Sequence, residues 1–407
     1  MTRQASRSVR FLPVFAVTLV VLAGCTRSQP AAGGPRTPGR TPSPRATTGN
    51  STTPQTTPAP LQTTPASATS APESPAPSAV PKPRVERVPY PKAPPAPETT
   101  SVPTVPITPL HAVQTARLTS PEGALAAFGS IWVSGHHSRT AFRVDPSNGA
   151  ILARIPGIGF HAQWPFAGGG LVWFPGDNSL VAIDPATNGV VRRFDGQVAS
   201  GVFAAGHPWV DDAHDSLVEL DPKTGAPLLR LKSGSGFPED CFNQVRFGDG
   251  SVWWSVQDAG VVVRIDPASG HVLSTISGVG QDPSEAAFAA GSVWVSSLDG
   301  SVRQIDPRTN QVTTVTTYAS QLPNTCADAT VGQGDTVWVG HGNASLLYEF
   351  DARTRTVTHV DDLGTAAAEG IAGFSQLQGI AVDGRSLWVP LYQAGQVQRF
   401  DPPAPSG

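Results

Sequence analysis

A short motif recurs seven times between Gly129 and Val389: a glycine, then a tryptophan followed by an apolar residue, and later an apolar residue followed by aspartate. Each aspartate follows its tryptophan by 11 to 13 positions, and successive tryptophans are 36 to 50 positions apart. A period near forty residues with short alternating apolar runs is typical of a β-propeller, one four-stranded blade per repeat. The sequence therefore predicts an all-β, seven-bladed propeller. The repeated residues are Trp132, Trp173, Trp209, Trp253, Trp294, Trp338 and Trp388, with Asp145, Asp184, Asp221, Asp266, Asp306, Asp351 and Asp401.

The two ends of the repeat array predict how the ring closes. The last repeat has its third strand at 396–400 and then stops without an outer strand. Residues 112–118, ahead of the first repeat, have outer-strand character and no partner of their own. Pairing these two segments would remove both exposed edges, so we expect the N-terminal strand to complete the last blade. The propeller then occupies 110–402 and is followed by a short tail at 403–407.

The N-terminus has the features of an export signal. Three arginines among the first ten residues precede an uncharged apolar run at 11–23, which is too short for an ordinary membrane-spanning helix. The run ends Leu22-Ala23-Gly24-Cys25, which resembles the lipobox of bacterial lipoproteins. The resemblance implies removal of a signal peptide at 1–24 and lipid attachment to Cys25, and hence an outward-facing protein on the bacterial cell membrane. An ordinary secretory signal with an incidental cysteine is the alternative.

A linker is predicted between the anchor and the propeller. Residues 25–109 are mostly Pro, Thr, Ala, Ser, Gly and Gln. Such a segment buries too little apolar surface to offset its chain entropy, so we expect it to be disordered. It would act as a spacer between membrane and propeller, the alternative being a neutral low-complexity tail.

The repeated tryptophans and aspartates are predicted to be scaffold. Asp-Pro in six of the seven repeats stands between the third and fourth strands, where Asp can accept a backbone hydrogen bond two residues on. The tryptophans should fill the space between neighbouring blades. Neither set is expected to be catalytic, and we find no catalytic constellation in the sequence.

Function is therefore expected on the other face, where the loops differ from blade to blade. The residues nine and ten positions before each blade tryptophan should lie at the mouth of the central channel. Carboxylates and amides prevail among them, a set that could hold a divalent cation or a polar ligand, although a hydrated channel would look the same. The candidate ligand-binding residues are Glu122, Gln163, Trp164, Asn243, Gln244, Glu285, Asp328 and Gln378.

The histidines and cysteines give weaker signals. His136, His137 and His341 follow second strands, and His161 lies near the mouth, but no pair has a recognisable zinc spacing, which favours surface histidines. Cys241 and Cys326 occupy equivalent loops two blades apart. An oxidising compartment favours a disulfide between them if those loops lean together, and free thiols are the alternative.

The repeats, such as Gly291 to Val295 followed by Ile305-Asp306-Pro307, resemble YVTN and NHL-type propellers and the virginiamycin B lyase superfamily. The lyases of that group use a Glu-x-His pair and a magnesium ion, and this sequence contains no Glu-x-His. The resemblance therefore implies the fold rather than the lyase chemistry.

Two functions are carried forward. The first is a monomeric membrane-anchored lipoprotein whose propeller binds a protein, glycan or small molecule through its irregular face without catalysis. The second is a metal-assisted lyase or lactonase at the channel mouth. Nucleic acid is not an expected partner, because the net charge is −3 and the pI about 6.3.

Overall fold

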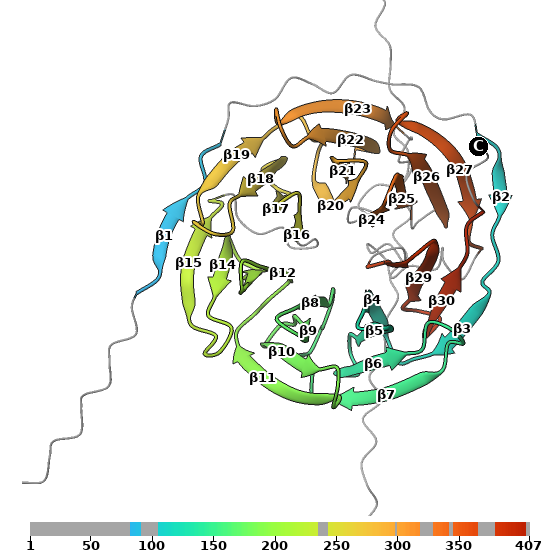
Figure 1. Cartoon of the computed structure of the whole chain (residues 1–407), viewed down its shortest axis with the longest axis horizontal. Coiled ribbons are helices and arrows are strands. Elements are labelled where there is room, and N and C mark those ends of the chain that lie inside the picture. Colours follow the sequence, from blue (N-terminus) through green and yellow to red (C-terminus); the bar gives the residue numbers. More distant parts are fainter. Residues whose placement is uncertain are drawn as a thin grey trace, which may run out of the picture. The chain divides into compact units, whose positions relative to one another are not determined.

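The computed structural model describes residues 82–90, 105–234, 243–297, 299–317, 329–341, 345–364 and 379–403. They form seven antiparallel sheets arranged around a ring, as Figure 1 shows, which confirms the predicted all-β, seven-bladed propeller. All the elements in these ranges are β-strands. Within the same ranges, no helix is long and apolar enough to cross a membrane.

Blades one to six run in chain order from an inner strand at the channel to an outer strand. Blade one contains β4 (Pro121–Ala127), β5 (Ser130–Gly135), β6 (Thr140–Val144) and β7 (Ile151–Pro156). Blade two contains β8 (Phe166–Gly168), β9 (Leu171–Phe174), β10 (Ser179–Asp184) and β11 (Gly189–Asp195). Blade three contains β12 (Ser200–Ala204), β13 (His207–Asp211), β14 (Ser216–Leu220) and β15 (Pro227–Lys232). Blade four contains β16 (Gln244–Gly248), β17 (Ser251–Val256), β18 (Val261–Ile265) and β19 (Val272–Ile276).

The remaining blades follow the same plan. Blade five contains β20 (Pro283–Ala289), β21 (Ser292–Ser297), β22 (Ser301–Asp306) and β23 (Gln311–Thr317). Blade six contains β24 (Thr330–Gln333), β25 (Thr336–His341), β26 (Leu346–Asp351) and β27 (Thr356–Asp362). Blade seven contains β28 (Ala381–Asp383), β29 (Ser386–Leu391), β30 (Gln396–Phe400) and, from the other end of the domain, β3 (Gln114–Arg117).

Strand β3 closes the ring as predicted. It pairs antiparallel with β30, from Gln114 opposite Arg399 to Arg117 opposite Gln396. The Leu118 amide then donates to the Gly395 carbonyl at 2.9 Å. The strand ahead of the first repeat and the last repeat thus share one sheet, and the edge of β30 is covered.

Two further strands were not predicted. β1 (Arg84–Arg87) adds in parallel to β15, and β2 (Ile107–Pro109) adds in parallel to β27, so blades three and six have five strands. Both lie within the predicted linker, so the expectation of disorder is wrong for these two segments. The Val88 amide donates to the Lys232 carbonyl at 2.9 Å, and its side chain is buried against blades three and four. Pairing with an open blade edge satisfies backbone groups that a free linker would leave to water.

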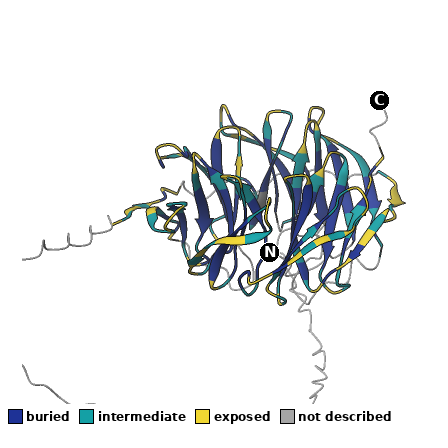
Figure 2. Ribbon diagram, turned by 60° about the horizontal axis from the view of Figure 1, so that its bottom comes forward, coloured by how far each residue is buried: buried dark blue, intermediate teal, exposed yellow. Residues whose placement is uncertain are grey.

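The blade tryptophans form the core between blades, as predicted. All seven are at most 1% exposed. Trp132 of blade one packs against Val172 and Phe174 of blade two, and Trp388 of blade seven packs against Ile131 of blade one. Figure 2 shows the same distribution, with buried residues along the strands and exposed residues mainly in the loops and on the outer strands.

Six of the seven repeated aspartates cap turns, as predicted, whereas Asp401 accepts the Ser386 hydroxyl and the Arg399 guanidinium. The carboxylate of Asp145 accepts the Ser147 amide at 2.8 Å, and Asp306 accepts the Arg308 amide at 2.8 Å. Equivalent bonds occur at Asp184, Asp221, Asp266 and Asp351. The hydrogen bonds hold the pKa of most of these carboxyls below its usual range. This face is therefore built from one repeated structural unit.

Candidate functional site

The irregular face gathers aromatic and titratable side chains where blades seven, one and two meet. His136 and His137 directly follow β5, and His161 lies in the connection between β7 and β8. One ring nitrogen from each of the three lies within 4.8 Å of the corresponding nitrogens of the other two. The ring centroid of His136 is 4.7 Å from that of His137 and 4.5 Å from that of His161. We call these three residues the histidine cluster.

The cluster is enclosed by other rings and is open on one side. Phe160 packs against His161 at a centroid distance of 3.8 Å with the ring planes tilted by 32°, and Arg139 lies over the Phe160 ring at 5.1 Å. Tyr392, after β29, meets His136 and His137 edge-on at 5.6 and 5.7 Å. His136 and His161 are partly buried, whereas His137 is exposed. The open side of the cluster is therefore at His137.

Each histidine turns its Nδ1 atom toward an oxygen. His161 Nδ1 is 2.6 Å from Asp177 Oδ2, and His137 Nδ1 is hydrogen-bonded to the Tyr392 hydroxyl. His136 Nδ1 is 3.8 Å from Glu122 Oε2, beyond hydrogen-bond range, and is buried without a hydrogen-bond partner. An oxygen at Nδ1 fixes the orientation of an imidazole and leaves its Nε2 atom for another contact.

Backbone hydrogen bonds hold the loops of the cluster together. The His161 amide donates to the His136 carbonyl at 2.9 Å, and the Asp177 amide donates to the Phe160 carbonyl at 2.9 Å. A Cβ at Gly176 would come within 2.9 Å of the Phe160 carbonyl oxygen, so only glycine allows this approach. His161 adopts a φ of +50°, which is uncommon for a residue other than glycine. The cluster is thus held by fixed backbone rather than by surface side chains alone.

Burial controls the electrostatics of the cluster. It raises the pKa of Glu122 to about 7, and the Glu122 side chain is 14% exposed. Burial, together with the charges of His161 and His137, lowers the pKa of His136 to about 3. His136 is therefore neutral at physiological pH, the form in which imidazole binds transition metals. Burial and the nearby Glu122 raise the pKa of Tyr392, which keeps the phenol protonated.

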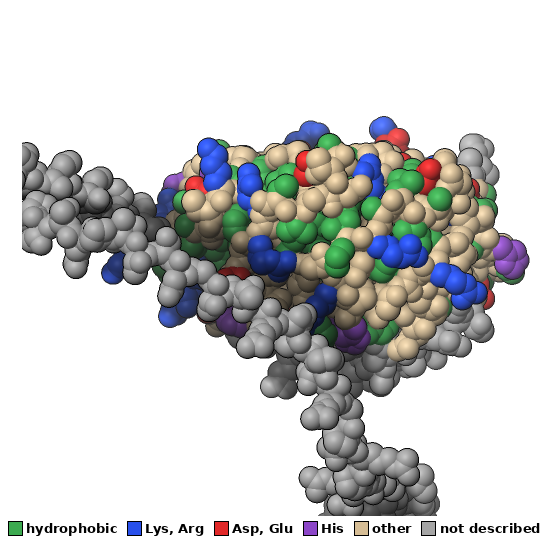
Figure 3. Space-filling view, turned by 90° about the horizontal axis from the view of Figure 1, so that it is seen from below, with side chains coloured by type: hydrophobic (Ala, Val, Ile, Leu, Met, Phe, Trp, Pro, Cys, Tyr) green, Lys and Arg blue, Asp and Glu red, His purple; other side chains and the backbone are tan. Residues whose placement is uncertain are grey.

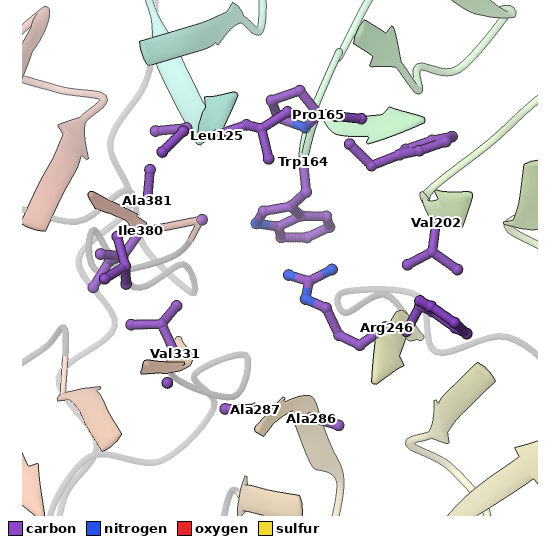
Figure 4. A pocket seen from close by; sticks show the side chains of 18 of the residues that line it. Leu125, Trp164, Pro165, Val202, Arg246, Ala286, Ala287, Val331, Ile380 and Ala381 are labelled. Atoms are coloured by element: carbon purple, nitrogen blue, oxygen red, sulfur yellow. The ribbon is translucent and has the colours of Figure 1, made fainter. Parts of the chain in front are cut away.

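The central channel holds a cavity of about 390 Å³. Inner strands of blades one to seven line it, mostly with small and apolar residues such as Leu125, Val202 and Ile380. Figure 4 shows the Trp164 side chain and the Arg246 guanidinium pointing toward one another within it. Burial lowers the pKa of Arg246 to about 10, so the group keeps its positive charge at neutral pH.

The structure places the predicted mouth residues in different settings. Trp164 lines the channel cavity. Glu122 belongs to the histidine cluster. Gln163, Asn243 and Gln244 are buried, at 6, 1 and 6% exposure, and each keeps a buried side-chain atom without a hydrogen-bond partner. Of these five residues, Trp164 is the one that lines the described channel cavity.

Asn243 belongs instead to a structural network between blades three and four. Its side-chain oxygen accepts the Gln257 amide at 3.0 Å, and its carbonyl accepts the Ser200 hydroxyl at 2.8 Å. In the same region, the fully buried Asp211 accepts Trp254 Nε1 at 2.8 Å. Burial raises the pKa of Asp211 to about 7. The sequence analysis did not single out this carboxyl, because nothing in its local sequence signals burial.

The other predicted sites lie outside the described residues. They are Cys25, Cys241, Cys326, Asp328 and Gln378, together with the side chains of Glu285 and His341. The lipid anchor, the disulfide and the remaining mouth positions therefore stay predictions.

The histidine cluster itself was missed as a unit. The positions of His136, His137 and His161 in the repeats predict the irregular face, but their spacing matches no zinc motif and so favours surface histidines. The signal that could have found them is positional. The end of β5 and the connection leading into β8 meet between adjacent blades, where the His161 amide bonds the His136 carbonyl.

Comparisons with known proteins bear on the fold. No protein-family model and no curated protein matches the sequence. One similar solved structure is a streptogramin B lyase (TM-score 0.56, 15% identity, covering 70% of this chain and 94% of that chain). Another is virginiamycin B lyase from Staphylococcus aureus, selenomethionine-substituted (TM-score 0.58, 15% identity, 71% and 99%). A third is Kuenenia stuttgartiensis hydrazine synthase (TM-score 0.56, 11% identity, 72% and 98%).

Such low identities show a shared fold and carry no activity across. The chain is a seven-bladed β-propeller that resembles virginiamycin B lyase in its architecture.

Proposed function

We propose that this protein is an outward-facing bacterial lipoprotein, anchored through Cys25, whose propeller binds a partner through its irregular face without catalysis. The partner would be a protein, a glycan or a small molecule. The anchor rests on the order of basic start, apolar run and cysteine at the N-terminus.

The observation that carries the proposal is the difference between the two faces of the ring. One face repeats the same Asp-capped turn from blade to blade. The other gathers the histidine cluster, Phe160, Tyr392 and the exposed Arg139 on loops fixed by backbone hydrogen bonds. Rigid loops carrying aromatic rings with polar edges are well suited to binding, because little entropy is lost on association.

Charge supports a partner other than nucleic acid. The net charge is −3. In Figure 3, Lys and Arg side chains are scattered over the face in view among hydrophobic and other side chains. Nucleic-acid binding requires clustered positive charge.

The alternative is a metal-assisted lyase or lactonase at the channel mouth. Among the described residues that line the channel cavity, Arg246 is the one with a charged side chain, and it is a cation. Like charges repel strongly where water is scarce, so Arg246 disfavours a divalent cation beside it. We therefore place binding ahead of metal-assisted catalysis in the channel.

The anchor is tested by Cys25→Ser in the native host. We expect the variant to leave the membrane fraction while the propeller keeps its melting temperature, because no described blade residue depends on Cys25. A variant that still partitions with detergent-extracted membranes would contradict the lipoprotein assignment. The platform is tested by quantitative pull-down from solubilised native envelope with the full chain as bait, and no saturable partner would count against it.

A further inference from the structure

We propose that His136, His137 and His161 form a binding site for one divalent transition-metal ion of the Zn²⁺ class. The three histidines are not among the residues that line the channel cavity. They lie on the irregular face proposed for binding, and metal binding there requires neither the lipid anchor nor a bound partner. The geometry points to the Nε2 atoms of the three imidazoles as the ligands, with a fourth position open to solvent.

The first argument is convergence. Three imidazoles from two different blades bring their nitrogens within 4.8 Å of one another. At metal–nitrogen distances of about 2.0–2.1 Å, the nitrogens of a tetrahedral site lie roughly 3.3 Å apart. Binding therefore draws the rings together by up to about 1.5 Å. His137, stacked on His136 at 13° between ring planes, has to rotate, and its exposed side chain leaves it room to do so.

The second argument is the set of oxygens behind the rings. Asp177 at His161, the Tyr392 hydroxyl at His137 and Glu122 near His136 all lie on the Nδ1 side. Metal-binding histidines almost always give their second nitrogen to a carboxylate, carbonyl or water, which orients the ring and strengthens the ligand. Two of these three groups are carboxyls, which offset the charge of a dication.

The third argument is an unpaired buried atom. His136 Nδ1 is buried and has no hydrogen-bond partner, although Glu122 Oε2 lies 3.8 Å away. A buried polar atom without a partner carries a free-energy cost, which is unusual unless a ligand, ion or water completes the site.

The ligand chemistry selects the metal. Imidazole nitrogens bind Zn²⁺, Cu²⁺ and Ni²⁺ well, whereas Mg²⁺ and Ca²⁺ require oxygen ligands. Three protein ligands with an open fourth position are also the arrangement that lets zinc bind an additional small ligand. The site thus differs in both position and ligand type from the carboxylate-and-amide ring predicted at the channel mouth.

The test uses the full chain, purified without an affinity tag and stripped with a chelator, titrated with ZnCl₂ and, separately, with MgCl₂. We expect one equivalent of Zn²⁺ to bind, the melting temperature to rise with Zn²⁺, and Mg²⁺ to have no effect. X-ray absorption should show three imidazole nitrogens at about 2.0 Å from zinc.

Variants assign the site. Asp177→Asn should weaken Zn²⁺ binding by about 10- to 100-fold, and His161→Ala by more than that. His271→Ala, at an exposed turn on the repetitive face, is the matched control and should bind like the wild type. Because thiols also bind zinc, a Cys241→Ser/Cys326→Ser double variant should retain binding.

The readings that would overturn the proposal are definite. They are no stoichiometric Zn²⁺ binding, binding lost in the double cysteine variant, or equal affinities for His161→Ala and His271→Ala. The melting temperature of each variant without metal separates loss of the site from loss of folding. If His136→Ala or His161→Ala fails to fold, His137→Ala removes a ligand from the exposed side of the cluster instead.

Discussion

Leu118 offers a direct test of how the ring is closed. It directly follows β3, and its side chain is 8% exposed in the cluster between blades seven and one, where Ile131, Val133 and Trp388 also lie. Leu118→Ala removes this apolar contact while leaving the backbone of the closing strand intact. Because the propeller depends on closure, we expect the whole domain, rather than one strand end, to lose stability.

The size of the effect follows from burial. Replacing a buried leucine by alanine costs about 2–5 kcal/mol, according to how far the neighbours collapse into the space. Strand β3 lies at the rim of the ring and its neighbours can adjust, so we expect the lower half of that range. For a domain of this size, each kcal/mol lowers the melting temperature by roughly 2–4 °C. The expected decrease is therefore about 4–14 °C.

Calorimetry or circular dichroism would measure the melting temperature of Leu118→Ala, with Val113→Ala as the matched control. Val113 precedes the same strand but its side chain is 55% exposed, so its loss should change stability by less than about 0.5 kcal/mol. A truncation starting at Thr119 should be more destabilising than Leu118→Ala. If Leu118→Ala and the truncation both melt like the wild type, β3 does not belong to the cooperative unit and this account of closure is refuted.

Two buried carboxyls give further predictions. The pKa of Asp211 is raised to about 7 in the folded state, so the folded protein keeps a proton that the unfolded chain loses near pH 4. The contribution of this group to stability therefore falls as pH rises from 4 to 7. Relative to Asp211→Asn, the wild-type free energy of unfolding should fall by up to about 1.4 kcal/mol per pH unit in that window, and a pH-independent difference in urea titrations would contradict the assignment. Glu349, 1% exposed, accepts Trp338 Nε1 at 3.0 Å and the Arg385 guanidinium at 3.0 and 3.1 Å. Glu349→Gln should destabilise the protein by about 2–4 kcal/mol, because it leaves Arg385 without an anion, and a melting temperature equal to that of the wild type would count against this pair.

Much of the fold could be predicted because its determinants are local and repeated. A tryptophan in the second strand and an Asp-Pro turn after the third recur in phase, and each has one place in a blade. Ring closure was predictable for the same reason, since the last repeat lacks a strand and 112–118 supplies one. β1 and β2 could not be predicted, because short segments between prolines have the composition of a linker. They form strands by pairing with the outer edges of blades three and six, which the local sequence does not indicate.

The site was less predictable because it depends on which loops meet. The distance from each blade tryptophan correctly predicted that Trp164 lines the channel. The same distance predicted channel positions for Glu122 and Asn243. In the structure, Glu122 faces His136 and Asn243 caps a neighbouring loop. The histidine cluster depends on the geometry between blades, on the close approach at Gly176 and on the conformation of His161. None of these is indicated by the spacing of residues in the sequence.

The most direct test of the working face is a crossed measurement on the partner captured from the native envelope. Affinity and melting temperature would be determined for Arg139→Glu on the irregular face and for Glu285→Ala/Asp328→Ala, which alters two of the predicted mouth residues. The same two quantities would be determined for Asp266→Ala and Asp306→Ala on the repetitive face. The account predicts that the first set loses affinity and keeps its melting temperature, while the second keeps its affinity and melts earlier. Loss of affinity confined to the turn variants would place the working surface on the opposite face and contradict the account.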